Sequence, residues 1–175
     1  MAQWRRDISW RQGHILESDT VTALGLEKSP SPGESVFVVV SHDCDLAQEP
    51  DIEAKCEIMV GTIVGKEDGN FSWAKNPRRL HLPFTAGDKK IIVDLNAQNK
   101  YLIDKDVLAD HMPASSVCLT PNELRILQSW LAARYQRAAF PDEFEQRLKD
   151  VPAKLYEKLS RILAGTSEHI VAIYF

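Results

Sequence analysis

Cysteines are few in this chain, and their placement gives no sign of a cross-linked fold. Three occur among 175 residues, at positions 44, 56 and 118. Their number is odd, their spacing is wide and no Cys-x-x-Cys pair is present, which argues against a disulfide framework and against a zinc knuckle of ordinary spacing. We therefore expect three reduced and partly buried thiols.

Long apolar runs are also missing. No stretch approaches the roughly 20 residues that a helix needs to cross a bilayer. The first residues, with Trp4, Arg5, Arg6 and Asp7, lack the apolar core of a signal peptide. We expect a cytoplasmic protein with no membrane partner. An apolar fraction of 44% over 175 residues allows one globular domain to bury a core without disulfides.

An excess of positive charge is absent, because 21 Lys and Arg residues face 25 Asp and Glu residues and give a net charge of −4. This balance argues against a generally basic nucleic-acid binder. The charges are nevertheless unevenly placed. Residues 43–57 contain six acids and one base, whereas residues 72–90 contain five bases and one acid. The two blocks could neutralise each other or form separate patches, and the sequence leaves both alternatives open.

Short β-type segments separated by turn signals fill the first two thirds of the chain. After an entry strand ending near Leu16, the expected strands are residues 36–40, 56–64, 71–73, 79–84, 90–95 and 100–103. Asp-Gly-Asn within residues 66–70 predicts a hairpin turn, because these residue types tolerate a positive φ. Short helices are expected where Ser18 and Asp19, and later Asp104, could act as caps. Strands at this spacing predict a strongly bent antiparallel barrel.

The last third of the sequence changes to helical periodicity. Thr120, Pro121 and Glu123 form a helix start, with a capping threonine, a proline at the first position and a glutamate at the third. Leucines at 124, 127 and 131 follow at helical spacing, so this helix is expected to pack on the barrel. Further helices are expected within residues 141–165, and a strand at residues 169–175.

These elements together predict an α+β fold in a single domain over residues 1–175. Residues 1–118 would form the mainly β, barrel-like part. Residues 119–165 would form C-terminal helices packed on it, and residues 166–175 a final strand returning to the sheet.

The apolar run 36–40 leads directly into side chains that can do chemistry. Such a run of β-branched residues predicts a buried strand, and functional residues are often placed where a rigid strand ends. We refer to residues 41–45 as the corner, and its candidate catalytic residues are His42, Asp43, Cys44 and Asp45. If the chain stays extended, His42 and Cys44 face one way while Asp43 and Asp45 face the other.

One hypothesis for the corner is a Cys/His-dependent hydrolase with Cys44 as the nucleophile, or a zinc pair formed with His42. Side chains two apart on a flat strand lie roughly 6–7 Å apart, which is too far for a direct hydrogen bond. His14 or His81 would therefore have to approach Cys44 from another strand.

A second hypothesis is a metal-dependent nuclease. Asp43, Asp45 and Glu53 offer the oxygen ligands that Mg²⁺ prefers, and Lys55 follows in a Glu-x-Lys arrangement. Mg²⁺ would then be the cofactor. The alternative to both hypotheses is a structural corner, since Asp side chains at strand ends commonly hydrogen-bond the backbone two residues on.

A basic group forms a further candidate site, for phosphate or for a partner. Its members are Lys75, Arg78, Arg79, Arg134 and Arg137. Arginine recognises phosphate and carboxylate groups through two parallel hydrogen bonds, and Trp73 adds a stacking surface nearby. Alternatively, Arg78 and Arg79 belong to a solvated turn and pair with the acidic block.

Four segments together resemble an uncharacterised family of prokaryotic proteins of about this length. They are residues 10–16 (WRQGHIL), 41–46 (SHDCDL), 75–81 (KNPRRLH) and 130–144 (WLAARYQRAAFPDEF). The resemblance covers nearly the whole chain and implies no particular chemistry.

The N-terminal part is also similar to the PemK/MazF-like toxins, which are small SH3-like barrels that cleave RNA. Gly13-His14-Ile15 followed by an apolar strand ending in Ser41 matches their order of elements. His14 stands where that family usually has an acid, the Arg-Pro before the apolar strand is absent, and the helical last third is extra. The resemblance therefore implies an SH3-like barrel more than it implies ribonuclease activity.

Two classes of function follow from these observations. We favour a non-catalytic accessory or binding subunit of a prokaryotic assembly, such as a defence or mobile-element system, with a protein partner. That preference rests on the spacing of the corner residues, which fits no standard catalytic arrangement. The alternatives are a metal-dependent nuclease or toxin-like ribonuclease acting on nucleic acid at the corner, and a Cys/His-dependent hydrolase.

Overall fold

The computed structural model describes residues 3–26, 34–133, 135 and 161. The chain divides into two compact units, residues 1–136 and residues 137–175. The helices expected within residues 141–165 and the strand expected at 169–175 lie outside the described residues, as do Arg134 and Arg137. The single domain over residues 1–175 stays a prediction.

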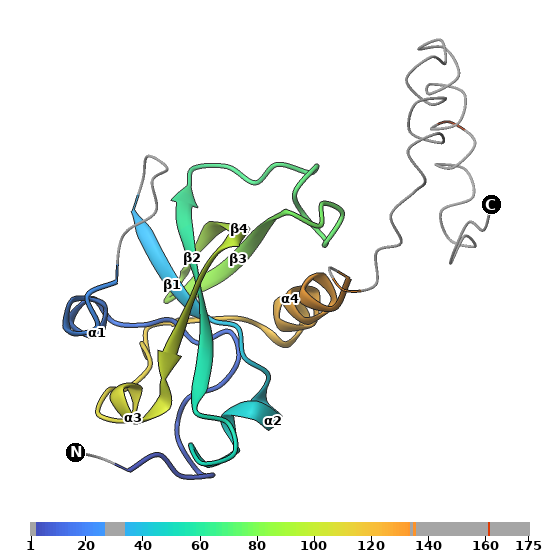
Figure 1. Ribbon diagram of the computed structural model, residues 1–175. Coiled ribbons are helices and arrows are strands. Elements are labelled where there is room, and N and C mark those ends of the chain that lie inside the picture. The colour runs from blue at the N-terminus through green and yellow to red at the C-terminus, as the bar shows by residue number, and fades with distance from the viewer. Residues whose placement is uncertain (1–2, 27–33, 134, 136–160, 162–175) are drawn as a thin grey trace. The chain divides into compact units, whose positions relative to one another are not determined.

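Five antiparallel strands form one sheet in the order β1-β2-β4-β3-β5, and the sheet curls into half a barrel (Figure 1). The strands are β1 (Ser35–Val39), β2 (Lys55–Val64), β3 (Arg79–Ala86), β4 (Lys89–Asp104) and β5 (Val117–Cys118). The helices are α1 (Ser18–Ala23), α2 (Asp43–Leu46), α3 (Lys105–Leu108) and α4 (Pro121–Ala133). The predicted α+β class and the bent antiparallel sheet are confirmed at this level.

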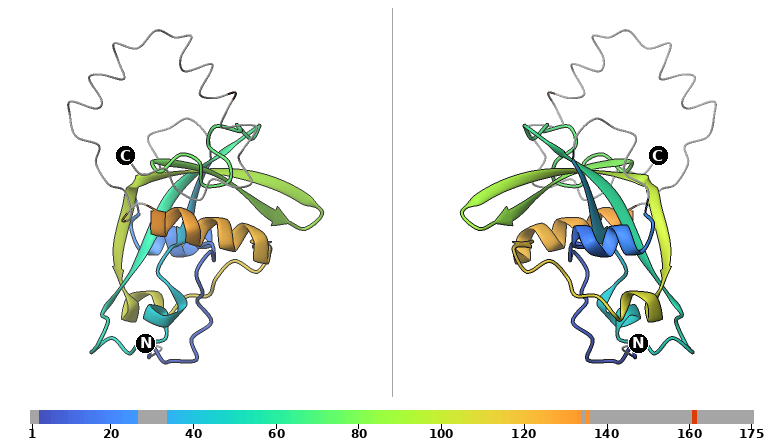
Figure 2. Two further views of the ribbon diagram at one scale, coloured as in Figure 1. Left: turned by 90° about the vertical axis from the view of Figure 1, so that its right-hand side faces the viewer. Right: turned by 90° about the vertical axis from the view of Figure 1, so that its left-hand side faces the viewer.

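The curl of the sheet depends on a bend in β4. Met59 of β2 faces Lys100, but Gly61 faces Leu95. An advance of two residues along β2 therefore corresponds to five residues along β4, so β4 contains extra residues at this point. Extra residues of this kind bend a strand and increase its twist. A Cβ at Gly61 would lie 2.5 Å from Val93 Cγ1, so only glycine fits beside the bend. Figure 2 shows β4 running beside β3 in their shared hairpin and then turning toward α3.

Three strand predictions are corrected by this arrangement. The segments expected at 90–95 and 100–103 are two parts of the single strand β4. No hairpin joins β2 to β3, because β4 lies between them in the sheet. Residues 71–73 form turns rather than a strand, and the 65–78 loop folds back so that the His81 N–H donates to the Phe71 carbonyl at 2.9 Å.

Strand β1 is buried on both faces, as its continuous apolar pattern predicts. Val36, Val38 and Val40 join a first core, which contains alternate residues of β2, β3 and β4. Phe37 and Val39 join a second core on the other face. Each fully buried side chain of this kind stabilises the fold by roughly 1.5–3 kcal/mol. The end of β1 is therefore a rigid support for the corner.

The second core is closed by the N-terminal segment and by the short helices α2 and α3. Trp4 and Trp10 are fully buried in it. The Trp4 indole donates to the Leu46 carbonyl at 2.9 Å, and the Trp10 indole donates to the Leu108 and His111 carbonyls at 3.3 and 3.1 Å. The expected entry strand is reduced to isolated bridges at Ile15 and Leu16, because this segment packs through side chains instead.

Helix α4 begins at Pro121, as predicted, and Thr120 Oγ1 accepts the Glu123 N–H at 3.4 Å. Leu127 and Trp130 of α4 are buried in the first core, so the helix packs on the sheet. Among the described residues, no helix is both long enough and apolar enough to cross a bilayer.

The predicted caps of the shorter helices are only partly correct. Helix α1 starts at Ser18 itself, with Glu17 at the cap position and no side-chain hydrogen bond there. Asp104 does occupy the cap position of α3, again without a side-chain hydrogen bond. Tertiary contacts therefore hold these short helices more than their caps do.

Candidate functional site

The corner is a strand-to-helix junction and not an extended strand end. Its chain leaves β1, turns at His42 and enters α2 at Asp43. His42 is the N-cap of α2, and its Nδ1 accepts the Cys44 N–H at 3.2 Å. The predicted alternation of His42 and Cys44 against Asp43 and Asp45 is therefore wrong, because helical geometry begins at Asp43 and replaces the two-residue period.

Ser41 and Asp43 are both engaged by the backbone. Ser41 Oγ accepts the Glu57 N–H at 2.7 Å, which joins the corner to β2. Asp43 Oδ1 accepts the Gln12 N–H at 2.8 Å, which joins the corner to the N-terminal segment. Gln12 is buried and donates through Nε2 to the Val40 carbonyl at 2.8 Å. These bonds give the corner the structural role that the sequence offered as its alternative.

No described histidine activates Cys44. The thiol is exposed, and in the described part of the chain it has no hydrogen bond to a ring nitrogen. His14 Nδ1 accepts the Arg11 N–H, and His81 Nδ1 accepts the Asp68 N–H in the 65–78 loop. All three cysteines are free thiols, of which Cys56 is buried while Cys44 and Cys118 are exposed. Burial raises the pKa of the Cys56 thiol to about 11.

His14 lies beside the corner in a setting that disfavours its charged form. Burial lowers the pKa of His14, the Arg11 charge lowers it further, and the Asp43 carboxylate opposes both effects. Protonation at Nδ1 would also remove the acceptor of the Arg11 N–H, which lies 3.1 Å away. Folding therefore selects the neutral imidazole.

We expect acid to destabilise the fold through His14. In the unfolded chain the imidazole binds a proton near pH 6.5, but in the folded protein it binds only at lower pH. Above pH 6.5 the imidazole is neutral in both states, so His14 does not affect the free energy of unfolding. As the pH drops from 6.5 toward the pKa of the folded protein, that free energy falls by at most about 1.4 kcal/mol per pH unit. Thermal unfolding from pH 7.5 to 5.0 should show a shallower loss for His14→Gln than for the wild type. Identical pH profiles would contradict this assignment.

The carboxylates expected to bind Mg²⁺ are not gathered into a metal site. Asp43 is used by the Gln12 N–H, while Asp45 and Glu53 line an adjacent pocket. In the described ranges no group of three or more His, Cys, Asp or Glu side chains is arranged to hold a metal ion. A Mg²⁺ cofactor at these residues stays a prediction.

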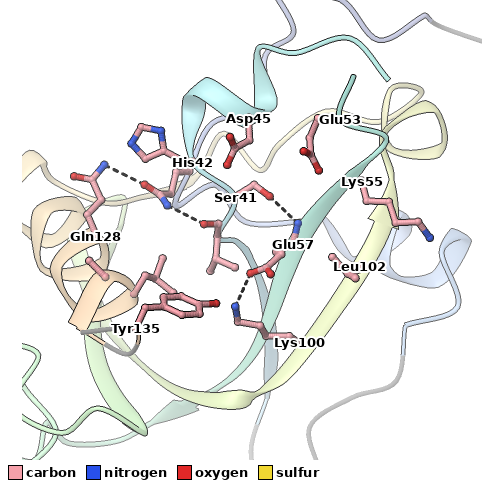
Figure 3. A pocket seen from close by; sticks show the side chains of 14 residues that line it. Ser41, His42, Asp45, Glu53, Lys55, Glu57, Lys100, Leu102, Gln128 and Tyr135 are labelled. Carbon is pink, nitrogen blue, oxygen red and sulfur yellow. Dashed lines mark hydrogen bonds and ion pairs between the residues drawn. The ribbon is translucent and has the colours of Figure 1, made fainter. Parts of the chain in front are cut away.

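An open pocket of about 470 Å³ lies beside the corner (Figure 3). Ser41, His42 and Asp45 contribute one side, and the start of β2 and the second half of β4 contribute the floor. The remaining wall comes from the end of α4 and from Tyr135. The full lining is Gln12, Val40, Ser41, His42, Asp45, Glu53, Lys55, Glu57, Lys100, Leu102, Gln128, Leu131, Ala132 and Tyr135.

The charged side chains of the pocket fall into paired and unpaired groups. Lys100 pairs with Glu57 at 2.5 Å, and Lys55 lies 3.5 Å from Asp104. Asp45 and Glu53 have no hydrogen bond or ion pair through their carboxylates within the described part of the chain. Figure 3 shows both carboxylates on the same side of the pocket as the Ser41 hydroxyl. The acceptor capacity of this pocket is therefore concentrated at Asp45 and Glu53.

Lys105 does not line the pocket, but it contacts the backbone of the lining residue Asp45. The side chain is fully buried, and its ammonium donates to the Asp45 and Gln48 carbonyls at 2.5 and 3.0 Å. Burial lowers the pKa of Lys105, while the Glu53 and Asp45 carboxylates act in the opposite sense. Lys105 thus ties the end of α2 to α3 and holds the backbone of Asp45 in place.

The basic candidates separate into a bound arginine and exposed cations. Arg79 forms a bidentate ion pair with Asp94, with distances of 2.6 to 3.0 Å between the guanidinium nitrogens and the carboxylate oxygens. The guanidinium carbon lies 4.5 Å from the Phe71 ring centre. The Asp94 carboxylate raises the pKa of Arg79 through these hydrogen bonds. Lys75 and Arg78 are exposed on the 65–78 loop. Arg79 is therefore structural, whereas Lys75 and Arg78 face solvent.

The acidic and basic blocks of the sequence find partners elsewhere. Arg79 pairs with Asp94, and Lys90 lies 4.0 Å from Glu123. Neither acid belongs to residues 43–57. Among the described residues, no ion pair joins the two blocks, which supports the alternative of separate patches.

Several pocket residues escape sequence reasoning. Gln12 lies more than a hundred residues before Gln128 and Tyr135 in the sequence, yet all three line the pocket. Gln128 Nε2 donates to Gln12 Oε1 at 3.0 Å. An isolated glutamine or tyrosine in a helical or loop context carries no signal of such a meeting.

Comparison with protein-family models, with curated proteins and with solved structures gave no match to this chain. The resemblances to a prokaryotic family and to PemK/MazF-like toxins therefore stay predictions.

Proposed function

We propose that this protein is a non-catalytic binding module that docks a partner protein through the pocket beside the corner. The observation that carries the proposal is the use of the corner's polar groups. Ser41, His42 and Asp43 each accept a backbone N–H, which occupies them in holding the fold. A nucleophile or general base needs its lone pair free and directed at substrate. The pocket, in contrast, keeps Asp45 and Glu53 available.

The occupant is an arginine or lysine side chain of the partner. Asp45 and Glu53 form no ion pair with a described residue, so their carboxylates can accept hydrogen bonds from a guanidinium or ammonium group. Leu131 and Ala132 offer apolar surface to the aliphatic stem of such a side chain. Tyr135, which is 81% exposed, adds an aromatic face for the cation. A volume of about 470 Å³ falls within the usual range of ligand pockets.

The wider setting belongs to the same proposal. An accessory subunit of a prokaryotic assembly, acting in the cytoplasm, would need a binding pocket and a stable scaffold but no reaction centre. The sheet would belong to the SH3-like class. Two features support this class: the five antiparallel strands, and the sharply bent strand β4, which pairs with both β2 and β3.

Peptide titration followed by two-dimensional NMR tests the occupant. A capped Ala-Arg-Ala peptide should shift the backbone signals of Asp45 and Glu53 with a dissociation constant on the order of a millimolar, as expected for one anchoring side chain. Capped Ala-Glu-Ala should not. Asp45→Asn combined with Glu53→Gln should weaken binding of the arginine peptide about tenfold. Asp51→Asn is the matched control, since Asp51 is exposed in the same acidic block but does not line the pocket.

Two outcomes would overturn this assignment. Equal shifts with the glutamate peptide would mean that the carboxylates do not select a cation. Equal binding by the double variant and Asp51→Asn would mean that the arginine docks elsewhere.

A cleavage assay tests the non-catalytic part separately. Purified protein and Asp45→Ala should both leave labelled RNA and DNA intact, with or without Mg²⁺. Cleavage by the wild type that is lost in Asp45→Ala would contradict the proposal and favour a nuclease acting at the corner.

A further inference from the structure

The 65–78 loop is held firmly at both ends, although it contains no helix or strand. Ser72 is buried, and its hydroxyl donates to the Asp68 carbonyl at 2.8 Å. The Asp68 N–H donates to His81 Nδ1 at 3.0 Å. At the other end, the indole of Trp130 in α4 donates to the Asn76 carbonyl at 2.7 Å. A loop anchored to β3 and to α4 in this way has a defined conformation.

Two consecutive residues of this loop adopt left-handed backbone conformations. Trp73 has φ +59° and Ala74 has φ +58°. A bulky residue in this region is an outlier, and backbone strain of this kind tends to collect at functional positions. With these two left-handed residues in succession, Ala74 packs against the first core while the Trp73 side chain is exposed.

Trp73 differs from the other tryptophans of the chain. Trp4, Trp10 and Trp130 are at most 1% exposed, whereas Trp73 is 63% exposed. Exposing a large aromatic ring costs apolar burial, and its backbone adds strain. Stability alone therefore does not account for a tryptophan at this position.

The ring is accompanied by two solvent-facing cations. Lys75 and Arg78 are exposed, and in the described ranges neither side chain has an ion pair. Asp94 neutralises Arg79, and Asn76 Oδ1 fixes the turn by accepting the Arg78 and Arg79 N–H groups at 2.9 and 3.1 Å. The loop also contains the acids Glu67 and Asp68 at its start, both exposed, and Asp68 accepts the Asn70 N–H within its own turn. Lys75 and Arg78 are the two exposed cations of the loop that follow Trp73 in the sequence.

We propose that the 65–78 loop binds single-stranded nucleic acid, with a base stacked on Trp73 and neighbouring phosphates contacted by Lys75 and Arg78. An exposed aromatic face with nearby cations is the combination that holds unpaired bases and their backbone. A duplex would offer phosphates but no accessible base face. A purely acidic peptide would offer negative charges but nothing to stack, and would leave the exposed ring unexplained. This site is separate from the pocket beside the corner, and it does not depend on the function proposed for that pocket.

Tryptophan fluorescence provides a direct test. Since the other three tryptophans are buried, a short oligo(dT) should quench the emission of Trp73 saturably at low salt. Contact with two phosphates predicts a slope of about −1.4 when the logarithm of the association constant is plotted against that of the salt concentration, and Arg78→Gln should reduce it by about 0.7. A matched duplex and a poly-glutamate peptide are the competing ligands. Both should quench far less.

Variants are compared by the anisotropy of a labelled oligonucleotide. Trp73→Leu should bind about tenfold more weakly, and Trp73→Phe should recover most of the affinity because it keeps a stacking face. Lys89→Glu is the control for charge and should change affinity little, because Lys89 begins β4 and faces Ala86, at the end of β3 opposite to the loop. Trp73→Gly relieves the left-handed strain, so it should lose binding while its melting temperature stays the same or rises.

Three results would overturn the proposal. They are the absence of saturable quenching at low salt, equal quenching by poly-glutamate, and unchanged affinity in both Trp73→Leu and Trp73→Gly. Equal quenching by poly-glutamate would indicate a docking surface for an acidic protein segment instead.

Discussion

Trp130→Ala should lower the free energy of unfolding by about 4 kcal/mol, the largest effect that we expect from a single substitution. Trp130 is fully buried in the first core, where it joins α4 to the sheet. Its loss removes a large apolar side chain, leaves a cavity and leaves the Asn76 carbonyl without the indole donor. Urea denaturation followed by circular dichroism measures the loss.

Two further variants separate the contributions of Trp130. Trp130→Phe keeps an aromatic ring in the core but cannot donate to Asn76, so we expect a smaller loss and faster amide exchange in the 65–78 loop. Arg125→Ala, on an exposed position of the same helix, should change stability by less than about 0.5 kcal/mol. If Trp130→Ala cost no more than Arg125→Ala, α4 would not be packed on the sheet as described.

The elements that the sequence predicted well are those with a strong local signal. Helix α4 has a cap, a proline and a glutamate in the correct order, and an apolar stripe behind them. Strand β1 consists of consecutive apolar residues, and both of its faces are buried. In each case the local pattern and the tertiary contacts favour the same structure, which is why the pattern was sufficient.

The errors arose where one local signal fits two structures. Asn96, Gln98 and Asn99 look like turn residues, but they occupy the bend of one continuous strand. Asp68 and Asn70 do form a turn, yet the following segment docks on β3 instead of pairing with β2. Polar residues serve turns and bulges equally well, and only the long-range pairing decides between them.

The corner illustrates the same limit at a functional scale. Its position was predictable, because a buried strand had to end there. Its geometry was not, since four residues are too short to show helical periodicity and α2 depends on Leu46 and Lys105 for its place. The pocket was likewise hidden, because its walls come from the corner, from β4 and from the end of α4.

The charge asymmetry of the sequence gains a physical meaning from these contacts. Asp45 and Glu53 from the acidic block line the pocket, and Lys75 and Arg78 from the basic block lie on the 65–78 loop. Because no ion pair among the described residues joins the blocks, each keeps charge for an outside partner. A cationic side chain for the first and a polyanion for the second would satisfy both surfaces.

Lys105→Met is the substitution with the second largest expected effect, a loss of about 2 kcal/mol in the free energy of unfolding. Two opposing contributions set this value. Burial of the ammonium is costly, as the lowered pKa of Lys105 indicates, and methionine removes that cost. The substitution also removes two charge-assisted hydrogen bonds, to the Asp45 and Gln48 carbonyls, and a cation 5.6 Å from the Trp4 ring centre. Methionine restores none of these interactions, so the loss should exceed the gain.

The outcome can be read at the pocket as well as in overall stability. Since Lys105 holds the backbone at Asp45, Lys105→Met should shift the amide signals of residues 43–48 and weaken binding of the arginine peptide. Lys89→Met, at an exposed position, should change neither the signals nor the unfolding free energy appreciably. A Lys105→Met protein as stable as the wild type would mean that the cost of burying the ammonium equals the strength of its hydrogen bonds. The lysine would then be kept for the geometry of the corner and not for stability, and the amide shifts at residues 43–48 would distinguish that case.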